Sequence, residues 1–366
     1  MRIAQIAPLQ VAVPPTRYGG TERVVSQLTE ELVRLGHEVT LFATGESQTT
    51  ARLIASVPQA INFNPEVDAS AYHLALLAEV YQRADEFDVI HSHLDYLTLP
   101  FLATTTVPTV ITLHGRIDRQ EFQHVLGVFN QARATYPAHY VAISQSQRRT
   151  QPHLNWVATI HHGIDVMSFP FSSISEDYLC FVGRVAPEKG PQRAIEIAKR
   201  AGVRLKIAAK VDPKDRAFFT AVIEPLLDHP LIEFLGEVDE TEKRQLMGKA
   251  RALVLPIDWP EPFGLVFIEA LACGTPVLTS PLGAAPELLR DGVTGYLRDT
   301  VDGLVEAVAR LPLLSRAACR REALERFDLR RMATDYVQVY ARLCRSHSQQ
   351  ILPSAARGSL ALGVPA

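Results

Sequence analysis

The stretch YLCFVGRVAPEKGPQRAIEIAKRAGVRLKIAAKV, residues 178–211, decides the fold class of this 366-residue chain. An apolar run at its start is followed by a polar loop at 186–190, and Pro191 suits the first position of a helix. Residues 194–198 give that helix its apolar contacts, and a second apolar run follows at 203–211. Strand, loop, helix and strand in this order form a βαβ unit, which implies a parallel sheet.

The same alternation continues on both sides of this unit. Downstream we expect a strand at 251–257, a helix that ends at 272 and a further strand at 275–280. Upstream we expect a strand at 3–7, a helix at 21–35 and a strand at 38–43. Short runs rich in branched residues, typical of buried parallel strands, occupy 88–93, 109–114 and 140–144.

These elements predict an α/β chain with two Rossmann-like, doubly wound parallel-sheet domains. A chain of 366 residues exceeds what one hydrophobic core usually serves, so we place the domains at 1–168 and 169–326. Residues 327–345 carry an apolar stripe at helical spacing and predict an amphipathic helix. Residues 346–366 lack periodicity, and we expect them to form a flexible tail.

The composition disfavours several classes of protein. The net charge is −3 and charged residues make up 21% of the chain, so we expect no nucleic-acid partner. The four cysteines are widely spaced without a CxxC pair, which favours a reducing, cytoplasmic location over a disulfide or zinc framework. The start MRIAQIAPL lacks the apolar core of a signal peptide, and no apolar run is long enough to span a bilayer. Peripheral contact with a membrane stays open.

The segment EPFGLVFIEALACGTPVL, residues 261–278, carries two carboxylates eight positions apart. Glu261 lies in a Pro-rich loop and Glu269 in the helix that follows, roughly 9 Å along its axis at about 1.5 Å per residue. The two acids can therefore bind hydroxyls at two points of an elongated ligand. For either acid alone a surface position is the simpler interpretation, but the apolar neighbours of Glu269 favour function, because a carboxylate among them needs a partner. The first helical amides would face a pyrophosphate, at Phe263, Gly264 and Leu265.

Two cations follow the end of a predicted strand in FVGRVAPEKG, residues 181–190. Ligands of open α/β sheets bind at this edge, outside the carboxyl ends of the strands. Arg184 and Lys189 can hold the two phosphates of a diphosphate and stabilise its charge as it departs. Two ordinary surface charges on a solvated loop remain the alternative.

Three more positions lie at strand ends. Gly19 and Gly20 follow the first strand, where a residue without Cβ lets the backbone approach a phosphate, although a tight turn explains them equally well. Neither the GxxxxGK[ST] nor the GxGxxG pattern is present there. His114 ends the strand at 109–114 and can donate to a sugar hydroxyl.

We expect no metal site. The sequence has no DxD triad of the kind that holds a metal on a diphosphate. His91 and His93 are expected to point to opposite faces of one strand, which counts against a shared ion.

Together, the GG pair before the first helix, HG after a central strand, GRVAPEKG and EPFGLVFIEALACGTPV resemble glycosyltransferase family 4, from Gly19 to about Tyr340. The resemblance implies the GT-B fold, in which two Rossmann-like domains face each other across a cleft. It also implies a retaining, metal-independent transfer of a sugar without a cofactor. The donor would be a UDP-, GDP- or ADP-sugar on the C-terminal domain. The acceptor would be an unidentified hydroxyl compound on the N-terminal domain, against which the helix at 327–345 would pack.

The resemblance assigns a role to each singled-out position. Glu261 would bind the donor sugar, Glu269 the ribose, and Arg184 and Lys189 the diphosphate. Backbone at Gly264 and Leu265 would contact phosphate and sugar, Gly20 would face the diphosphate and His114 the sugar. The expected catalytic residues are His114, Arg184, Lys189 and Glu261. The expected donor-binding residues are Gly19, Gly20, Arg184, Lys189, Glu261, Phe263, Gly264, Leu265 and Glu269.

Other functions of the same architecture stay open. A nucleotide-sugar epimerase would release product without an acceptor, and a sugar phosphorylase would require inorganic phosphate. A non-catalytic nucleotide-sugar-binding protein is disfavoured by the four intact charged residues. A dehydrogenase is disfavoured because the GxGxxG pattern is missing.

Overall fold

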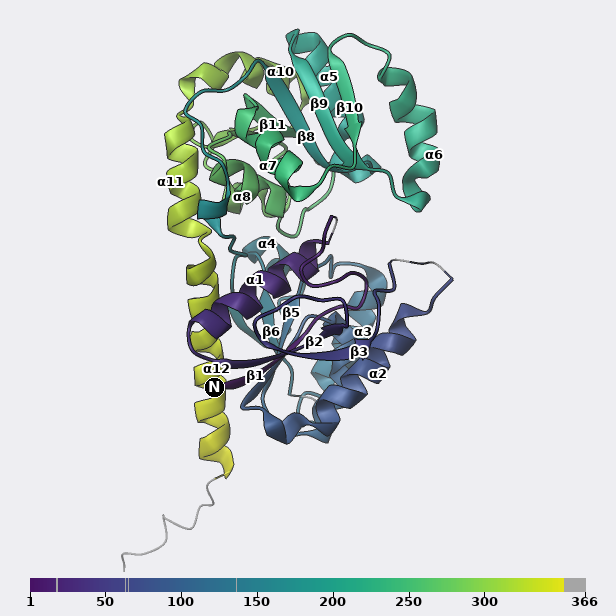
Figure 1. Cartoon of the computed structure of the whole chain (residues 1–366), viewed down its shortest axis with the longest axis vertical. Helices are drawn as coiled ribbons and strands as arrows, with labels where there is room; N and C mark the ends of the chain where they lie inside the picture. Colours follow the sequence, from purple (N-terminus) through teal and green to yellow (C-terminus); the bar gives the residue numbers. More distant parts are fainter. Residues whose placement is uncertain (18, 63, 65, 136, 352–366) are drawn as a thin grey trace, which may run out of the picture.

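The chain forms two parallel sheets, one in each lobe of the molecule (Figure 1). The computed structural model describes residues 1–351 except 18, 63, 65 and 136. The first sheet contains β1 (Arg2–Ile6), β2 (Glu38–Thr44), β3 (Arg52–Val57), β4 (Val89–Ser92), β5 (Thr109–Leu113), β6 (His139–Ala142) and β7 (Trp156–Thr159). The second contains β8 (Tyr178–Arg184), β9 (Arg204–Lys210), β10 (Ile232–Gly236), β11 (Ala252–Leu255), β12 (Val277–Thr279) and β13 (Gly295–Leu297).

Helices flank both sheets. Those of the N-terminal lobe are α1 (Gly20–Arg34), α2 (Ala69–Gln82), α3 (Gln120–Gln131) and α4 (Gln145–Thr150). Those that follow are α5 (Pro191–Ala201), α6 (Arg216–Phe218), α7 (Glu240–Lys249), α8 (Leu265–Ala272), α9 (Ala285–Leu288), α10 (Val301–Arg310), α11 (Arg316–Arg326) and α12 (Leu329–Ile351). Short 3-10 segments include η2 (Asp95–Thr104) and η4 (Pro187–Lys189), and a π-helical turn at η6 (Phe219–Ile223) extends α6.

Strand order explains where a ligand can bind. The sheets run β3-β2-β1-β4-β5-β6-β7 and β10-β9-β8-β11-β12-β13, and neighbouring strands pair in parallel. In each sheet the chain reverses its direction of winding once, between β1 and β4 and between β8 and β11. Loops leaving such a point diverge and open a crevice at the carboxyl ends of the strands. The predicted pair of doubly wound sheets is confirmed.

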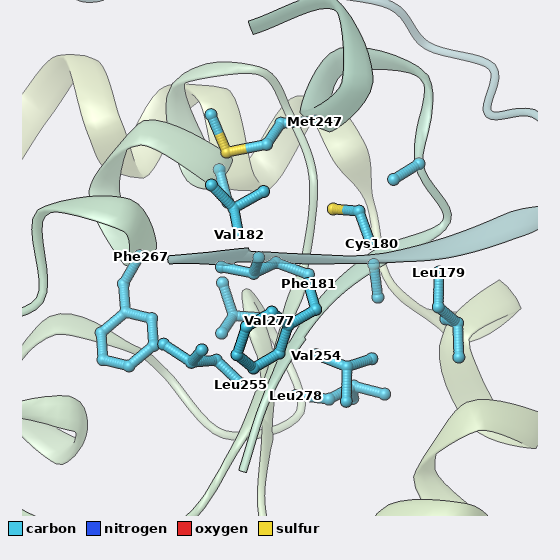
Figure 2. Packing of buried hydrophobic residues seen from close by; sticks show 14 of the residues in the cluster. Leu179, Cys180, Phe181, Val182, Met247, Val254, Leu255, Phe267, Val277 and Leu278 are labelled. Carbon is cyan, nitrogen blue, oxygen red and sulfur yellow. The ribbon is translucent and has the colours of Figure 1, made fainter. Parts of the chain in front are cut away.

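Continuous apolar runs place the central strands in the cores. In the second sheet the side chains of β8, β11 and β12 pack with Met247 of α7 and Phe267 of α8 (Figure 2). Leu179, Phe181 and Val254 in this core are fully buried. Cys180, Cys273 and Cys319 are buried free thiols, which behave here as small apolar side chains.

The last helix returns to the first lobe. The chain crosses between the lobes twice, and the crossings are hydrogen-bonded to each other, from Ile164 N to Phe327 O at 2.9 Å and from Leu329 N to Ile164 O at 3.0 Å. Figure 1 shows α12, in yellow, running along the N-terminal lobe. Its Tyr336 and Tyr340 are buried in one cluster with α1 and β1.

The helix extends further than its apolar stripe predicted. It continues to Ile351, so residues 346–351, expected in the flexible tail, are helical. The rest of that predicted tail, 352–366, lies outside the described residues. Over the described part of the chain, no helix combines the length and apolar character needed to cross a bilayer.

Four strands escaped prediction, and all four are sheet edges. β3 and β7 close the first sheet, and β10 and β13 close the second. β3, β7 and β10 are only half-buried and β13 has three residues, so none presents the long apolar run of a central strand.

The packing of α12 makes a prediction about stability. Tyr336→Ala removes a fully buried ring, and we expect the free energy of unfolding to fall by about 3–5 kcal/mol. The matched control is Tyr72→Ala, because that ring is 46% exposed and its loss should change stability by less than about 1 kcal/mol. Urea denaturation followed by circular dichroism measures both. Equal stability of the two variants would show that α12 does not support the N-terminal lobe.

Candidate active site

A cavity of about 560 Å³ lies between the two lobes. Its wall contains every residue singled out from the sequence, namely Gly19, Gly20, His114, Arg184, Lys189, Glu261, Phe263, Gly264, Leu265 and Glu269. Strand polarity brings them together. β1 and β5 of one sheet and β8 and β11 of the other end at this cleft, and their following loops carry the polar groups.

The two loops of the C-terminal wall are joined by an ion pair. Lys189 Nζ, in η4 after β8, donates to Glu261 Oε2, in the loop after β11. Trp259 Nε1 donates to the same oxygen at 3.1 Å, and the Lys189 ammonium lies 4.9 Å from the centre of the Trp259 ring. The side chains of Lys189 and Glu261 are 19% and 10% exposed. Water therefore screens this pair little, and each partner fixes the other at the mouth of the cleft.

Arg184, at the end of β8, is surrounded by carboxylates. It donates to Asp215 at 2.5 Å and to Glu188 at 2.6 Å, and its Nε lies 3.7 Å from Asp212 Oδ2. Its side chain is 13% exposed, so the solvated-loop alternative is wrong for this residue. The sequence did not predict these partners, and a phosphate on Arg184 would share the guanidinium with them.

The first turn of α8 faces the cleft. Gly264 precedes the helix with φ +94°, and an added Cβ would lie 2.7 Å from the Phe267 ring, so glycine is required here. Leu265 begins the helix and lines the cavity. The amides of a first helical turn lack carbonyl partners within the helix, so this end can bind an anion.

Glu269 lies one turn deeper and is 4% exposed. Both of its oxygens accept from Lys243 Nζ at 3.0 Å. Lys243 also pairs with Glu240 at 2.9 Å, and Glu240 pairs with Arg23 of α1 at 3.1 Å. Burial acts to raise the pKa of Glu240, but Lys243 and Arg23 outweigh it and hold the pKa below its ordinary value. This chain of charges connects the buried carboxylate of one lobe to the first helix of the other.

A second polar chain ends at His114, the residue after β5. His93 Nε2 donates to Gln5 Oε1 at 2.9 Å, which leaves His93 Nδ1 to accept from His114 Nε2 at 2.8 Å. Burial lowers the pKa of His114 to about 3 and that of His93 well below its ordinary value, so both rings are neutral near pH 7. His114 therefore uses its N–H inside the protein, and Nδ1, an acceptor, is the ring nitrogen left for a ligand. This differs from the donor role that the sequence suggested.

His91 of β4 and His93, the residue that follows this strand, lie on the same side, with ring centres 4.1 Å apart. The expectation that they point to opposite faces was wrong, because residues two apart in a strand share a face. His91 instead continues the polar chain, since its Nδ1 lies 2.7 Å from the Tyr340 hydroxyl of α12. Within the described residues, no three His, Cys, Asp or Glu side chains are placed to hold a metal ion.

Glu22, in the first turn of α1, also lines the cavity. Glu22 is only 4% exposed, and burial raises the pKa of its carboxyl group from 4.5 to about 7. Within the described chain, the one hydrogen bond to its carboxylate comes from its own backbone amide, which partly opposes that shift.

Sequence reasoning missed several residues of the cleft. Trp259 stands two positions before Glu261, and Lys243 lies on a helix that gave no ligand-binding signal. His162, in the segment after β7, stacks on His114 with ring centres 5.3 Å apart and meets the Phe263 ring edge-on at 4.7 Å. Of the residues missed, only Glu22 could have been found from the sequence, because it stands just after the Gly pair.

Two family models match the chain and together cover most of it. The model described as "Glycosyl transferases group 1" matches residues 170–325. The model described as "Glycosyltransferase Family 4" matches residues 18–167. The boundary between the two matches falls at the first crossing between the lobes.

Individual proteins resemble the chain along almost its whole length. A glycogen synthase of Mycobacterium tuberculosis is 29% identical over 92% of this chain and 94% of the relative. A phosphatidyl-myo-inositol mannosyltransferase of Mycobacterium leprae is 27% identical over 95% and 99%. The crystal structure of Anabaena HepE in complex with UDP and glucose superposes with a TM-score of 0.69 at 21% identity, over 95% of this chain and all of that one. The shared fold is GT-B.

The buried Glu22 predicts a pH-dependent stability. Between pH 4.5 and about 7 the folded protein keeps a proton that the unfolded chain has released, so stability falls as the pH rises through this window. Glu22→Gln removes the cost of the buried charge and should raise the free energy of unfolding at pH 8, by on the order of 3 kcal/mol at most. The gain should vanish below pH 4.5. Thermal unfolding from pH 4 to 8 measures it, and a gain independent of pH would contradict the assignment.

Proposed function

We propose a donor, a stereochemical course and a metal-free mechanism for this chain, which belongs to glycosyltransferase family 4. The proposed reaction moves a hexose-type sugar from a nucleoside diphosphate to a hydroxyl acceptor with retention of the anomeric configuration. The observation that carries the proposal is the pair of lysine-bound carboxylates, Glu261 and Glu269, at the mouth and in the second turn of α8. Their spacing suits a ligand that has hydroxyls at both ends and an anion in the middle.

The donor would lie along this line. Glu269 would accept from the ribose hydroxyls and Glu261 from hydroxyls of the sugar, while the diphosphate would occupy the first turn of α8, near Gly264 and Leu265. Lys189 is already held beside this position by Glu261 and Trp259. The UDP and glucose in the HepE complex support a nucleotide and a sugar as ligands of this fold.

Positive charge would drive departure of the leaving group. As the bond from the anomeric carbon to the phosphate oxygen breaks, both electrons stay on the diphosphate. Lys189, Arg184 and the amides at the start of α8 would stabilise that charge without a metal ion. Because these groups are held in place before the reaction, little reorganisation is needed when the charge develops.

The acceptor would approach from the N-terminal wall, on the face that the diphosphate leaves. Its oxygen forms the new bond to the anomeric carbon, and its proton passes to the departing phosphate oxygen. Nδ1 of His114 would accept a hydrogen bond from a hydroxyl of the sugar and so orient the donor. The hydrogen bond from His114 to His93 fixes the orientation of the His114 ring. Closure of the lobes would exclude water and limit hydrolysis of the donor.

Donor binding comes first among the tests. Thermal shift with UDP-, GDP- and ADP-sugars identifies the base, since a ligand that binds only the folded state raises the melting temperature. Incubation with the preferred donor alone, then with acceptors and EDTA, distinguishes transfer from epimerisation and tests metal independence. Proton NMR of the product reports the anomeric configuration. A folded protein that binds no sugar nucleotide would exclude the proposed function.

Loss of the mouth ion pair should sharply reduce transfer. We expect Lys189→Ala to lower kcat by about 100-fold or more, because a group that stabilises the leaving charge is removed. Lys199→Ala, on the exposed face of α5, is the matched control and should keep the wild-type rate. A nucleotide-release assay measures both. Wild-type turnover by folded Lys189→Ala would remove this residue from the mechanism.

The ribose role of Glu269 has a separate consequence. Glu269→Gln should weaken binding of the nucleoside diphosphate roughly 10-fold or more, because a charge-assisted hydrogen bond becomes a neutral one. The same variant should discriminate less between ribose and 2′-deoxyribose forms of the nucleotide. Isothermal titration calorimetry measures both affinities. Unchanged discrimination would place the ribose elsewhere.

A further inference from the structure

Glu22 is an acid in the cleft that no other described side chain binds. It is the third residue of α1, it lines the cavity, and it is 4% exposed. No described side chain forms an ion pair or hydrogen bond with its carboxylate, whereas the two acids of the opposite wall are each bound by a lysine. The acceptor positions of Glu22 are therefore open to a hydrogen-bond donor in the cavity, which a ligand can supply in place of water.

Helix capping does not account for this acid. The residue before α1 is Gly19, which has no side chain to complete a reciprocal cap. In α7 the reciprocal cap is formed by Asp239 and Glu242, each bound to the backbone amide of the other. Glu22 occupies the position of Glu242 in that motif but bonds only its own amide.

The other ionisable groups on the same wall are engaged or neutral. Arg23 pairs with Glu240 at 3.1 Å and donates to the Arg17 carbonyl at 2.9 Å, and Arg17 lies 3.8 Å from Glu237. Both carboxylates belong to the C-terminal wall. The remaining titratable groups are His114 and His162, whose pKa values burial lowers far enough to leave them neutral. Among the described residues lining this wall, Glu22 is thus the one acidic side chain, and it has no charged partner.

We propose that Glu22 binds a hydroxyl of the acceptor, and that this acceptor is an uncharged polyhydroxyl compound, a sugar or polyol, and not a phosphorylated one. The proposal rests on the proposed function, which puts the donor on the opposite wall. Above pH 7, where Glu22 is ionised, its carboxylate accepts hydrogen bonds from two neighbouring hydroxyls and repels an anion in a site from which water is excluded. On this wall an acceptor phosphate would meet Arg23, which already pairs with Glu240, and Arg17, which is 66% exposed and lies 3.8 Å from Glu237, and it would lie beside the donor diphosphate.

The test compares matched acceptors with the donor that the thermal-shift panel selects. Glucose, glycerol and maltotriose are paired with glucose 6-phosphate, glycerol 3-phosphate and maltotriose phosphate, and release of nucleoside diphosphate above the donor-only rate is measured. Wild-type protein should use the uncharged members at least 10-fold better. Preference for the phosphorylated members, or transfer to none of the uncharged ones, would overturn the inference while leaving donor binding and the proposed function intact.

Variants then assign the preference to Glu22. Glu22→Gln keeps the size of the side chain and should lower kcat/KM for the best uncharged acceptor at least 10-fold, with the dissociation constant of the nucleoside diphosphate changed less than twofold. Glu30→Gln, on the same helix and bound to Thr49 and Thr50, is the matched control and should match wild type. Equal kcat/KM in Glu22→Gln, or an equal loss of nucleotide affinity, would refute the acceptor role. A wild type that binds no nucleotide in the same titration would instead refute the proposed function, and the inference with it.

Discussion

The ion pair between Lys189 and Glu261 is the contact on which the site depends. It joins two loops that leave neighbouring strands, β8 and β11, and it is only 10–19% exposed. Removing either partner would leave a charge with little water around it, which is far more costly than breaking a surface pair. The pair therefore fixes the mouth of the cleft, and Trp259 closes over it through a hydrogen bond and its ring. A ligand enters a site whose charges are already placed.

The two lobes are linked by polar contacts on several sides of this mouth. Ser144, which precedes α4, donates its hydroxyl to Pro262 O at 2.7 Å, beside Glu261. Arg23 joins Glu240, and through Lys243 reaches Glu269. Groups that would bind the donor thus lie next to groups that hold the lobes together.

Much of this arrangement follows from the sequence. The βαβ pattern predicted both sheets, and all ten singled-out residues line one cavity. Edge strands such as β3 and β10 were missed because a half-exposed strand has no continuous apolar run. Lys243 and His162 were missed for another reason, since an isolated lysine or histidine has no local pattern that marks it.

The sequence by itself determined the fold class and the side of each sheet on which the chemistry lies, because strand polarity is a local property and every parallel strand ends at the same edge. It did not determine which charges are paired. Lys189 and Glu261 are 72 positions apart, and Gln5 and His93 are 88 apart, so their contacts depend on how strands are ordered and lobes are packed. Only the tertiary structure left Glu22 without a partner in the cleft, because that depends on where neighbouring charges such as Arg23 found theirs.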